Sequence, residues 1–201
     1  MSIFRRIMLG GGIDIESLPD TQKLYYKATA KVSPKSGSLG SAIMINNWDS
    51  TTGEGIIVCA SDIIKIEDSA FSECSSLTSI TIPNSVKSIG YSPFNGCGFT
   101  SVTIPDSVTE IGYAAFYACR SLTNVTIGNS VTTIGGWAFR DCYSLTSVYC
   151  KAITPPALED MFVFEGIYSG LKIYVPTESV DAYKSAKNWR GKAYLIEGYE
   201  F

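Results

Sequence analysis

Six cysteines are the residues of this sequence best suited to redox, metal or nucleophilic chemistry. A disulfide needs Cβ atoms about 3.5–4.5 Å apart, whereas side chains stacked on successive strands of a repeat lie about 4.8 Å apart with parallel Cβ vectors. Zinc sites use ligand pairs such as C-x-x-C, often with histidine, and the chain has neither. We therefore expect buried free thiols without a metal or catalytic role, four in one repeated column and two at strand positions: Cys74, Cys97, Cys119 and Cys142, then Cys59 and Cys150.

Histidine is absent from all 201 residues. Its absence removes the commonest general base, the commonest metal ligand, and every Ser-His or Cys-His nucleophile arrangement. The carboxylates of Glu159, Asp160 and Glu197 show no pairing pattern, and we expect them to be solvated. The glycines at 10–12 lack the strand and helix that a phosphate loop needs. The sequence therefore predicts that the chain is not an enzyme and binds no cofactor.

The charge of the chain is balanced, with 16 basic and 19 acidic residues scattered along it. Nucleic acid is therefore not the expected partner, because phosphate binding needs a concentrated basic face. No apolar run approaches the ~20 residues that cross a bilayer. Two arginines precede an apolar stretch at residues 7–9, which is shorter than the ~7–15 residues of a signal-peptide core. We expect residues 1–12 to be a flexible or docking peptide.

The cysteine column belongs to an internal repeat. Residues 66–86, 89–108 and 111–131 align almost residue for residue, and a fourth copy begins at 134 and diverges after 150. Phenylalanine recurs at 71, 94, 116 and 139, in step with cysteine at 74, 97, 119 and 142. The middle interval of both columns is one residue shorter than the others, because Gly98-Phe99 replaces a Ser-Ser-Leu sequence after Cys97. Regular repeats of this length predict a solenoid whose coils contact only their neighbours.

Each repeat has the pattern of a short strand followed by a tight corner. Leu77, Ile80 and Ile82 are spaced three and then two residues apart, and the last two alternate with Ser or Thr, the period of a β-strand. Proline or glycine ends each strand. The Ala-Phe-x-x-Cys element that follows suits one helical or 3₁₀ turn. The strands should stack in parallel at about 4.8 Å per coil.

The repeat can be extended toward both ends. Counting back by one repeat places Ile57, Cys59 and Ile63 under Ile80, Ile82 and Val86, which predicts a degenerate first coil at 55–66. Strands at 24–32 and 41–46 would form an N-terminal cap. Residues 171–176 repeat the strand-then-proline pattern as a last coil.

A helix and a final strand are expected to close the C-terminal end. Thr177 is a suitable N-cap for a helix with Val180, Tyr183 and either Ala186 or Lys187 on one face, and a final strand is expected at 194–196. This division gives an N-terminal segment and cap at 1–54, repeats at 55–153, and a last degenerate coil with the C-terminal cap at 154–201.

These residues resemble the BspA-like, or treponemal-type, leucine-rich-repeat family. Its pattern, L-x-x-V-x-I-P-x-x-V-x-x-I-G-x-x-A-F-x-x-C, is matched three times, and the resemblance covers roughly residues 55–185. It implies an α/β leucine-rich-repeat solenoid of about five coils with parallel strands, an N-terminal β cap and a C-terminal helical cap. It also implies a bacterial, often surface-associated, non-catalytic recognition module that adheres to a protein or glycan on another surface.

A second functional reading comes from the first six residues. They are also similar to the opening of structural proteins of phages and of mobile elements of gut anaerobes. The alternative function is therefore a structural component, docked through residues 1–12 to a larger assembly such as a virion.

Two surface features carry the candidate ligand-binding residues. In leucine-rich repeats the outward strand positions are the usual ligand surface, and here most of that surface is a field of small hydroxyls that β-propensity and solubility explain. Its C-terminal end differs, because Tyr149, Lys172 and Tyr174 lie there. For these three residues, binding and a structural role both remain open. The full outward series is Ile56 and Val58, Ser79 and Thr81, Ser101 and Thr103, Asn124 and Thr126, Ser147 and Tyr149, then Lys172 and Tyr174.

The second feature is a group of aromatic residues beside the phenylalanine column: Tyr91, Tyr113, Tyr117, Trp137 and Tyr143. Stacked on adjacent coils, they would form a patch suited to sugar rings or to a protein partner. Shielding of the solenoid edge explains them equally simply. Of the two patches we favour the strand-face patch, because parallel strands hold their side chains rigidly.

Overall fold

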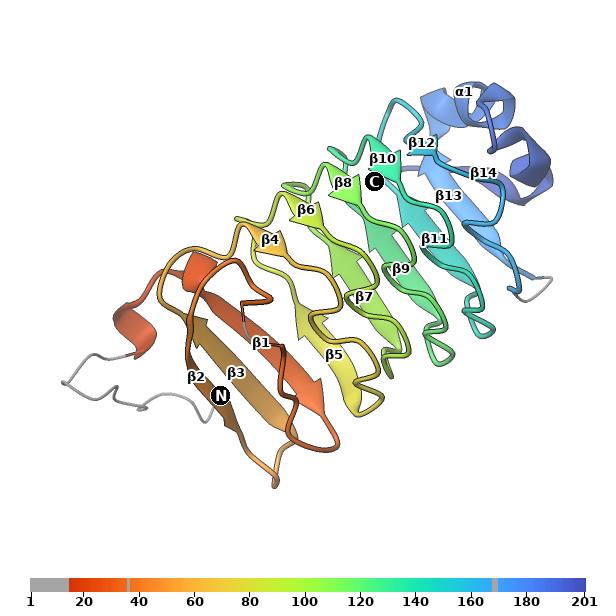
Figure 1. The fold of residues 1–201 in the computed structure, drawn as a ribbon. Helices are drawn as coiled ribbons and strands as arrows, with labels where there is room; N and C mark the ends of the chain where they lie inside the picture. Colours follow the sequence, from red (N-terminus) through yellow and green to blue (C-terminus); the bar gives the residue numbers. More distant parts are fainter. Residues whose placement is uncertain (1–14, 36, 168–169) are drawn as a thin grey trace.

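The coils of the protein follow one another along a single axis (Figure 1). The computed structural model describes residues 15–35, 37–167 and 170–201, so the proposed docking peptide at residues 1–12 lies outside the described residues. An antiparallel sheet forms the N-terminal end of the array, and short helical segments form the C-terminal end (Figure 1). Within the described residues, no helix is both long and apolar enough to cross a membrane.

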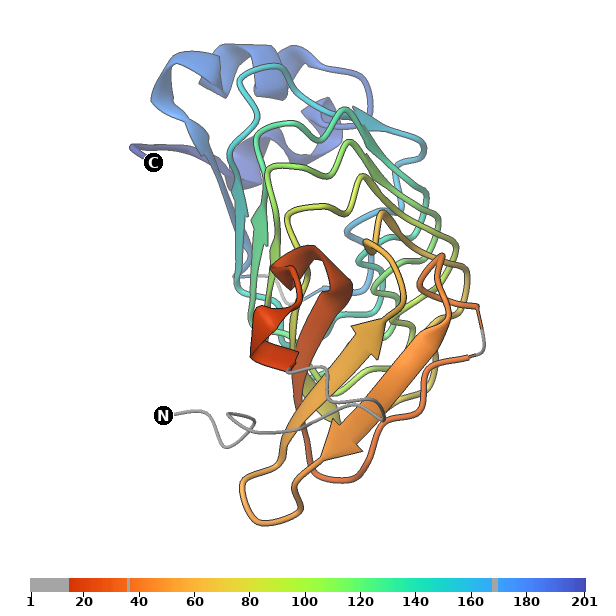
Figure 2. The same cartoon turned by 90° about the vertical axis from the view of Figure 1, so that its left-hand side faces the viewer.

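Two rows of parallel strands, one of longer and one of shorter strands, follow the repeats along the axis. Viewed nearly along the axis, the coils overlay, with the longer strands on one side and turns on the other (Figure 2). The registers are regular, for example Val102 opposite Val125 and Val125 opposite Val148. This arrangement confirms the predicted solenoid. The longer strands are β5 (Leu77–Thr81), β7 (Ser101–Ile104), β9 (Asn124–Ile127), β11 (Ser147–Cys150) and β13 (Lys172–Pro176); the shorter ones are β4 (Lys65–Ile66), β6 (Ser88–Ile89), β8 (Glu110–Ile111), β10 (Thr133–Ile134) and β12 (Ala157–Leu158).

A continuous stack of phenylalanines fills the core behind the turns. The rings of Phe71, Phe94, Phe116, Phe139 and Phe164 follow one another with centroids 5.6, 5.1, 5.3 and 5.6 Å apart. All five side chains are buried. Phe164 extends the column by one coil that the sequence repeat does not reveal, because it follows Phe139 at a longer interval than separates the other members.

The corner after each short strand is not the helical or 3₁₀ turn predicted from the Ala-Phe-x-x-Cys element. It consists of successive turns with two residues of positive φ in each of the first four coils, for example Ala114 (φ 51°) and Ala118 (φ 54°). These left-handed residues interrupt any helix. They also turn the backbone toward the next coil, so that the N–H of Phe116 donates to the carbonyl of Ala138 at 2.8 Å.

The residues predicted to form a degenerate first coil instead belong partly to the N-terminal cap. Strands β1 (Lys23–Ala28) and β2 (Ile43–Trp48) lie close to the expected cap strands, but β1 also inserts between β3 (Glu54–Cys59) and β5, antiparallel to both. The prediction that Ile57 and Cys59 lie directly under Ile80 and Ile82 is therefore wrong. The reason is that β1 takes up the backbone hydrogen bonds along this edge of β5. On the other ladder Ile66 does pair with Ile89, as a repeat should.

Pairing along the strand ladder is interrupted between β5 and β7. The link from Cys97 to Phe99 holds one residue, where the other repeats have two. Only glycine fits there, because a Cβ on Gly98 would lie 2.2 Å from the carbonyl oxygen of Ser75. Within the described residues a single backbone hydrogen bond joins the two strands, from Thr100 N to Thr78 O at 3.4 Å, while its equivalents in the next three coils measure 2.9 Å. The sheet is thus divided into two parts.

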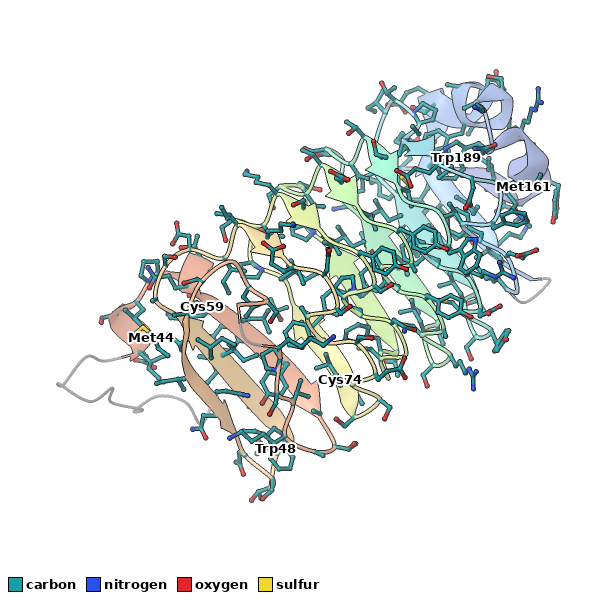
Figure 3. All side chains as sticks on the ribbon, in the orientation of Figure 1. Met44, Trp48, Cys59, Cys74, Met161 and Trp189 are labelled. Atoms are coloured by element: carbon teal, nitrogen blue, oxygen red, sulfur yellow. The ribbon has the colours of Figure 1, made fainter. Side chains whose placement is uncertain are left out.

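The C-terminal cap is anchored by two buried aromatic residues. Trp189, which lies beneath the helical segments (Figure 3), donates from Nε1 to the Pro156 carbonyl at 2.7 Å, and the Tyr183 hydroxyl donates to the Ala152 carbonyl at 2.7 Å. The cap comprises the 3₁₀ segment Thr177–Ser179, α1 (Val180–Ser185), the 3₁₀ segment Arg190–Leu195, and β14 (Ile196–Tyr199), which pairs in parallel with β13.

Two details of the C-terminal cap correct the sequence prediction. Thr177 does not cap the helix, because its hydroxyl donates to Glu200 at 2.7 Å and α1 begins only at Val180. The last strand begins at Ile196 rather than 194, because the preceding residues form a 3₁₀ helix.

Candidate recognition surfaces

The outward side chains of β5, β7, β9, β11 and β13 form one surface, which we call the strand face. All ten predicted positions on these strands are exposed or half-buried. Ile56 and Val58 are the exceptions in the predicted series, since both are fully buried. They pack with Ile15 and Leu18, because β3 belongs to the cap and the 3₁₀ segment Ile15–Ser17 covers its outer side.

The C-terminal end of the strand face carries an aromatic group that we call the tyrosine ladder: Tyr149, Tyr174 and Tyr199. The first two rings stack with centroids 4.9 Å apart, and Tyr199 meets them edge-on at 5.3 and 5.7 Å. Phe201 continues the group, 5.1 Å from Tyr199. Sequence reasoning missed Tyr199 and Phe201. The signal that could have found Tyr199 is a parallel β14 in register with β13, which places it opposite Pro176.

The predicted cation of this patch, Lys172, is paired with a carboxylate of a neighbouring strand. Lys172 lies beside Ser147 on the neighbouring strand and forms an ion pair with Glu197 on β14. Hydrogen bonding to Glu197 raises the pKa of the Lys172 ammonium. The structure therefore brings Tyr149, Lys172 and Tyr174 together, with the lysine held to one side by a carboxylate.

The second predicted patch lies at the corners, and we call it the turn-side cluster: Tyr91, Tyr113, Tyr117 and Trp137. Tyr91 and Tyr113 stack at 5.2 Å, and Trp137 lies 5.4 and 6.1 Å from Tyr113 and Tyr117. The guanidinium of Arg140 covers the Trp137 ring at 4.5 Å. Trp137 itself has a φ of 60°, which is costly for a bulky residue.

Tyr143 was predicted to belong to this patch, but no ring contact among the described residues joins it to the cluster. It is exposed and lies against Arg120, whose guanidinium carbon is 5.8 Å from the ring centre. The hydroxyl of Tyr117 is hydrogen-bonded to Asp141, which raises the pKa of that phenol. The cluster is therefore a surface of stacked rings bordered by two arginines and a carboxylate.

The cysteine column is confirmed as an inward-facing stack, with one correction. Cys97, Cys119 and Cys142 are buried, and each thiol donates to the phenylalanine carbonyl of the preceding coil at 3.1–3.2 Å. Cys74 is only half-buried, because it belongs to the first complete coil and no earlier phenylalanine carbonyl among the described residues receives its thiol. Burial raises the pKa of the Cys59 thiol to about 11 and of the Cys142 thiol to about 12. These groups are protonated at neutral pH and poorly suited to nucleophilic chemistry.

The carboxylates singled out in the sequence have structural partners. Glu159 accepts a hydrogen bond from the Gly136 backbone at 3.2 Å, and Asp160 accepts one from the Phe162 backbone at 2.8 Å. Throughout the part of the chain that the structure describes, no three His, Cys, Asp or Glu side chains converge as a metal site would require. What the two surfaces offer is aromatic contact area with a few charged groups beside it.

Comparison with protein families agrees with the repeat and its geometry. A family model for the BspA type leucine rich repeat region, in six copies, matches residues 54–162, which is more than half of the chain. The chain belongs to this family. BspA-type repeats therefore account for the stretch from β3 to the last turns before the C-terminal cap.

Two solved structures of leucine-rich-repeat proteins are similar to this BspA-type chain. One, from Bacteroides ovatus, is 31% identical over 56% of the chain, with a TM-score of 0.42. The other is a leucine rich cell surface protein from Faecalibacterium prausnitzii, 21% identical over 69% of the chain, with a TM-score of 0.35. The chain spans 31% and 58% of the lengths of these two proteins. No functionally curated protein matches it.

Membership of the BspA-type family indicates a protein-binding or surface-recognition module. Leucine-rich-repeat proteins are typically binding modules without catalytic activity.

Proposed function

We propose that the chain is an adhesion module that binds a protein or glycan on another surface through the tyrosine ladder. The observation that carries the proposal is the geometry of its three rings, two stacked at 4.9 Å and the third set edge-on against both. Tyrosine and tryptophan supply large, rigid contact areas at low entropic cost, and they dominate the energetics of binding surfaces.

The ladder is better placed for this role than the middle of the strand face. Between Ser79 and Asn124 the outward side chains are short and polar, so they offer little apolar area to a partner. At the ladder, β13 is paired on both sides, by β11 and β14, which fixes the ring positions before a ligand arrives. Preorganised side chains lose less entropy on binding.

The proposal is tested by screening the purified protein against glycan and extracellular-matrix arrays and measuring the affinity of variants for each hit. Tyr149→Ala combined with Tyr174→Ala should weaken binding at least about tenfold, the loss of about 1.4 kcal/mol expected when a ring of a binding surface is removed. Asn124→Ala, which shortens a polar side chain on the same face, is the matched control and should bind like the parent. If the tyrosine pair binds normally and Trp137→Ala abolishes binding, the turn-side cluster is the site and the proposal is wrong.

A further inference from the structure

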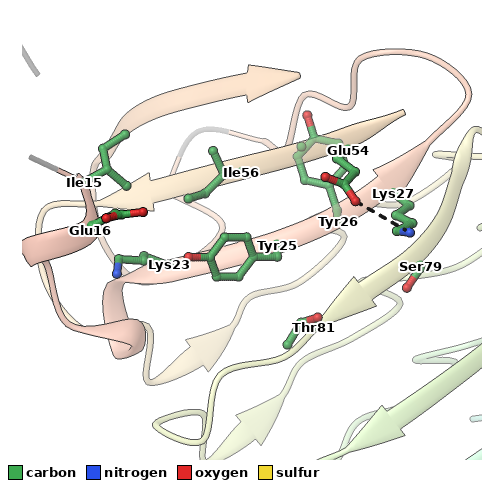
Figure 4. A pocket seen from close by; sticks show the side chains of 11 residues that line it. Ile15, Glu16, Lys23, Tyr25, Tyr26, Lys27, Glu54, Ile56, Ser79 and Thr81 are labelled. Carbon is green, nitrogen blue, oxygen red and sulfur yellow. Dashed lines mark ion pairs between the residues drawn. The ribbon is translucent and has the colours of Figure 1, made fainter. Parts of the chain in front are cut away.

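The insertion of β1 creates a pocket of about 460 Å³ at the N-terminal end of the strand face (Figure 4). Tyr25 projects from β1 into this pocket, in register with Ile56 on one side and Thr81 on the other. Its ring is 37% exposed and forms an aromatic platform. The pocket is within the size range of small-ligand sites, which are concave and partly apolar with a few polar groups.

Charged groups flank the platform at both ends. The side chain of Lys23 is only 5% exposed, and its ammonium lies 3.2 Å from the carboxylate of Asp20. At the other end Lys27 lies 3.7 Å from Glu54, the pair marked in Figure 4. An ammonium has three N–H donors, and the contact with Asp20 uses one donor of Lys23. Hydrogen-bond donors and acceptors therefore lie at both ends of the ring.

A second hollow adjoins the first. It is the gap between β5 and β7, about 520 Å³ in volume, and it shares Ser79 and Thr81 with the pocket. Apart from the hydrogen bond from Thr100 N to Thr78 O, no backbone hydrogen bond among the described residues joins these strands along the gap. Backbone N–H and C=O groups are strong hydrogen-bonding groups, so a polar ligand could pair with them here in place of water. Together the two hollows form a trough that runs across β1, β5 and β7.

The composition of the trough selects for a class of ligand. Its charges cancel, with three lysines and three carboxylates: Lys23, Lys27, Lys151, Glu16, Glu54 and Asp106. A neutral ligand with many hydroxyls fits this balance, because hydroxyls both donate and accept and sugar rings stack on aromatic faces.

An added peptide strand does not fit the trough. It would hold β5 and β7 about 9.6 Å apart, twice the ordinary strand spacing. Thr100 N is still only 3.4 Å from Thr78 O where these strands begin.

We propose that this trough binds a neutral oligosaccharide, with one sugar ring on Tyr25 and the following rings over the gap between β5 and β7. Strands follow one another at about 4.8 Å, close to the length of one sugar unit in an extended chain, so successive sugars meet successive strands. The site goes beyond the proposed adhesion site. It lies at the opposite end of the strand face from the tyrosine ladder and does not depend on it.

The test measures binding of neutral pentasaccharides of β-1,4-linked glucose, xylose and mannose by calorimetry. At least one should bind with a Kd below about 1 mM, and Tyr25→Ala should weaken it about tenfold or more, the effect of losing one stacking ring. Tyr25→Phe, which keeps the ring, should bind within about threefold of the parent, a difference of about 0.7 kcal/mol. Failure of all three sugars, or equal binding by Tyr25→Ala, overturns the proposal.

Two further measurements separate this site from the tyrosine ladder. In nuclear magnetic resonance titrations of the full chain, the backbone signals of Tyr25, Ser79 and Thr81 should shift with the sugar while those of Tyr149 and Tyr174 stay in place. This readout does not depend on any variant folding. The combined Tyr149→Ala and Tyr174→Ala variant should bind the pentasaccharide like the parent. If that variant loses the sugar and Tyr25→Ala keeps it, the trough proposal fails and the ladder proposal stands.

Discussion

A buried cysteine in this core donates a hydrogen bond, which an alanine at the same position could not do. Each of Cys97, Cys119 and Cys142 donates from Sγ to a phenylalanine carbonyl of the preceding coil, an oxygen that also accepts a backbone N–H within its own turn. The sequence column predicts that these residues face inward, and five of the six cysteines are buried. It does not predict the hydrogen bond, because that depends on how the left-handed corners bring one coil to the next. Cys74 differs from the other three, since it occupies the same column but no phenylalanine carbonyl of an earlier coil among the described residues accepts its thiol.

Because of the buried thiols, we expect the free energy of unfolding to fall as the pH becomes alkaline. Their pKa is higher in the folded protein than in the unfolded chain, so the unfolded state releases these protons first as pH rises. The stabilisation is therefore complete below about pH 8.5 and falls above it. For Cys142, with a folded pKa of about 12, the stabilisation is lost progressively as pH rises between those two values. Urea unfolding between about pH 8.5 and 10 should show a shallower decline for Cys142→Ala than for the parent. An identical decline in both proteins contradicts the prediction.

Strands and corners differ in how far local sequence determines them. Outward Ser and Thr alternate with inward Ile and Val, and this alternation predicts the strands β5, β7, β9 and β11 closely. In a strand alternate side chains point to opposite faces, so only one register buries all the apolar side chains. The corners were predicted wrongly as helical turns. Ala114 and Trp137 adopt positive φ there, which side-chain type does not signal and which the stacked phenylalanines and coil-to-coil hydrogen bonds impose.

The phenylalanine column joins the coils, and Phe116 is its central member. Its ring contacts Phe94 and Phe139 at 5.1 and 5.3 Å and is fully buried. Phe116→Ala should lower the free energy of unfolding by about 3–5 kcal/mol, and hydrogen exchange should quicken in the coils on both sides. The control is Tyr91→Ala, which removes an exposed ring whose one ring contact among the described residues is with Tyr113; its loss should be below about 1 kcal/mol. If Phe116→Ala lowers the free energy of unfolding by as little as the control does, the phenylalanine column does not stabilise the packing between coils.

The molecule as a whole is a solenoid whose strand ladder is broken once and capped by an inserted strand. The one shortened repeat interval, between Cys97 and Cys119, lies at the break, although the repeat pattern alone does not predict that pairing stops there. The sequence does not place β1, whose position follows from long-range pairing with β3 and β5 that no repeat pattern encodes. The sequence predicts two residues of the tyrosine ladder, Tyr149 and Tyr174, because they lie on regular strands of the repeat. The trough was missed, because it is formed by these two irregular features together.

The break can be repaired, and the repair tests its role. Replacing Gly98-Phe99 with Arg-Ser-Leu, the residues that occupy 120–122, restores the two-residue link and should let β7 pair with β5 as β9 pairs with β7. The matched control is Phe99→Leu alone, which loses the contacts of that ring with Phe94 and Phe116 at 5.4 and 6.4 Å but keeps the short link. Relative to this control, the free energy of unfolding should rise by about 1 kcal/mol for each backbone hydrogen bond gained. Amides of β5 and β7 should exchange more slowly, and pentasaccharide binding should weaken because the gap has closed. If the amides of both strands exchange at the same rate as in the control, the short link is not what separates the strands. If the amides exchange more slowly but the sugar still binds as tightly, the gap is not part of the sugar-binding site.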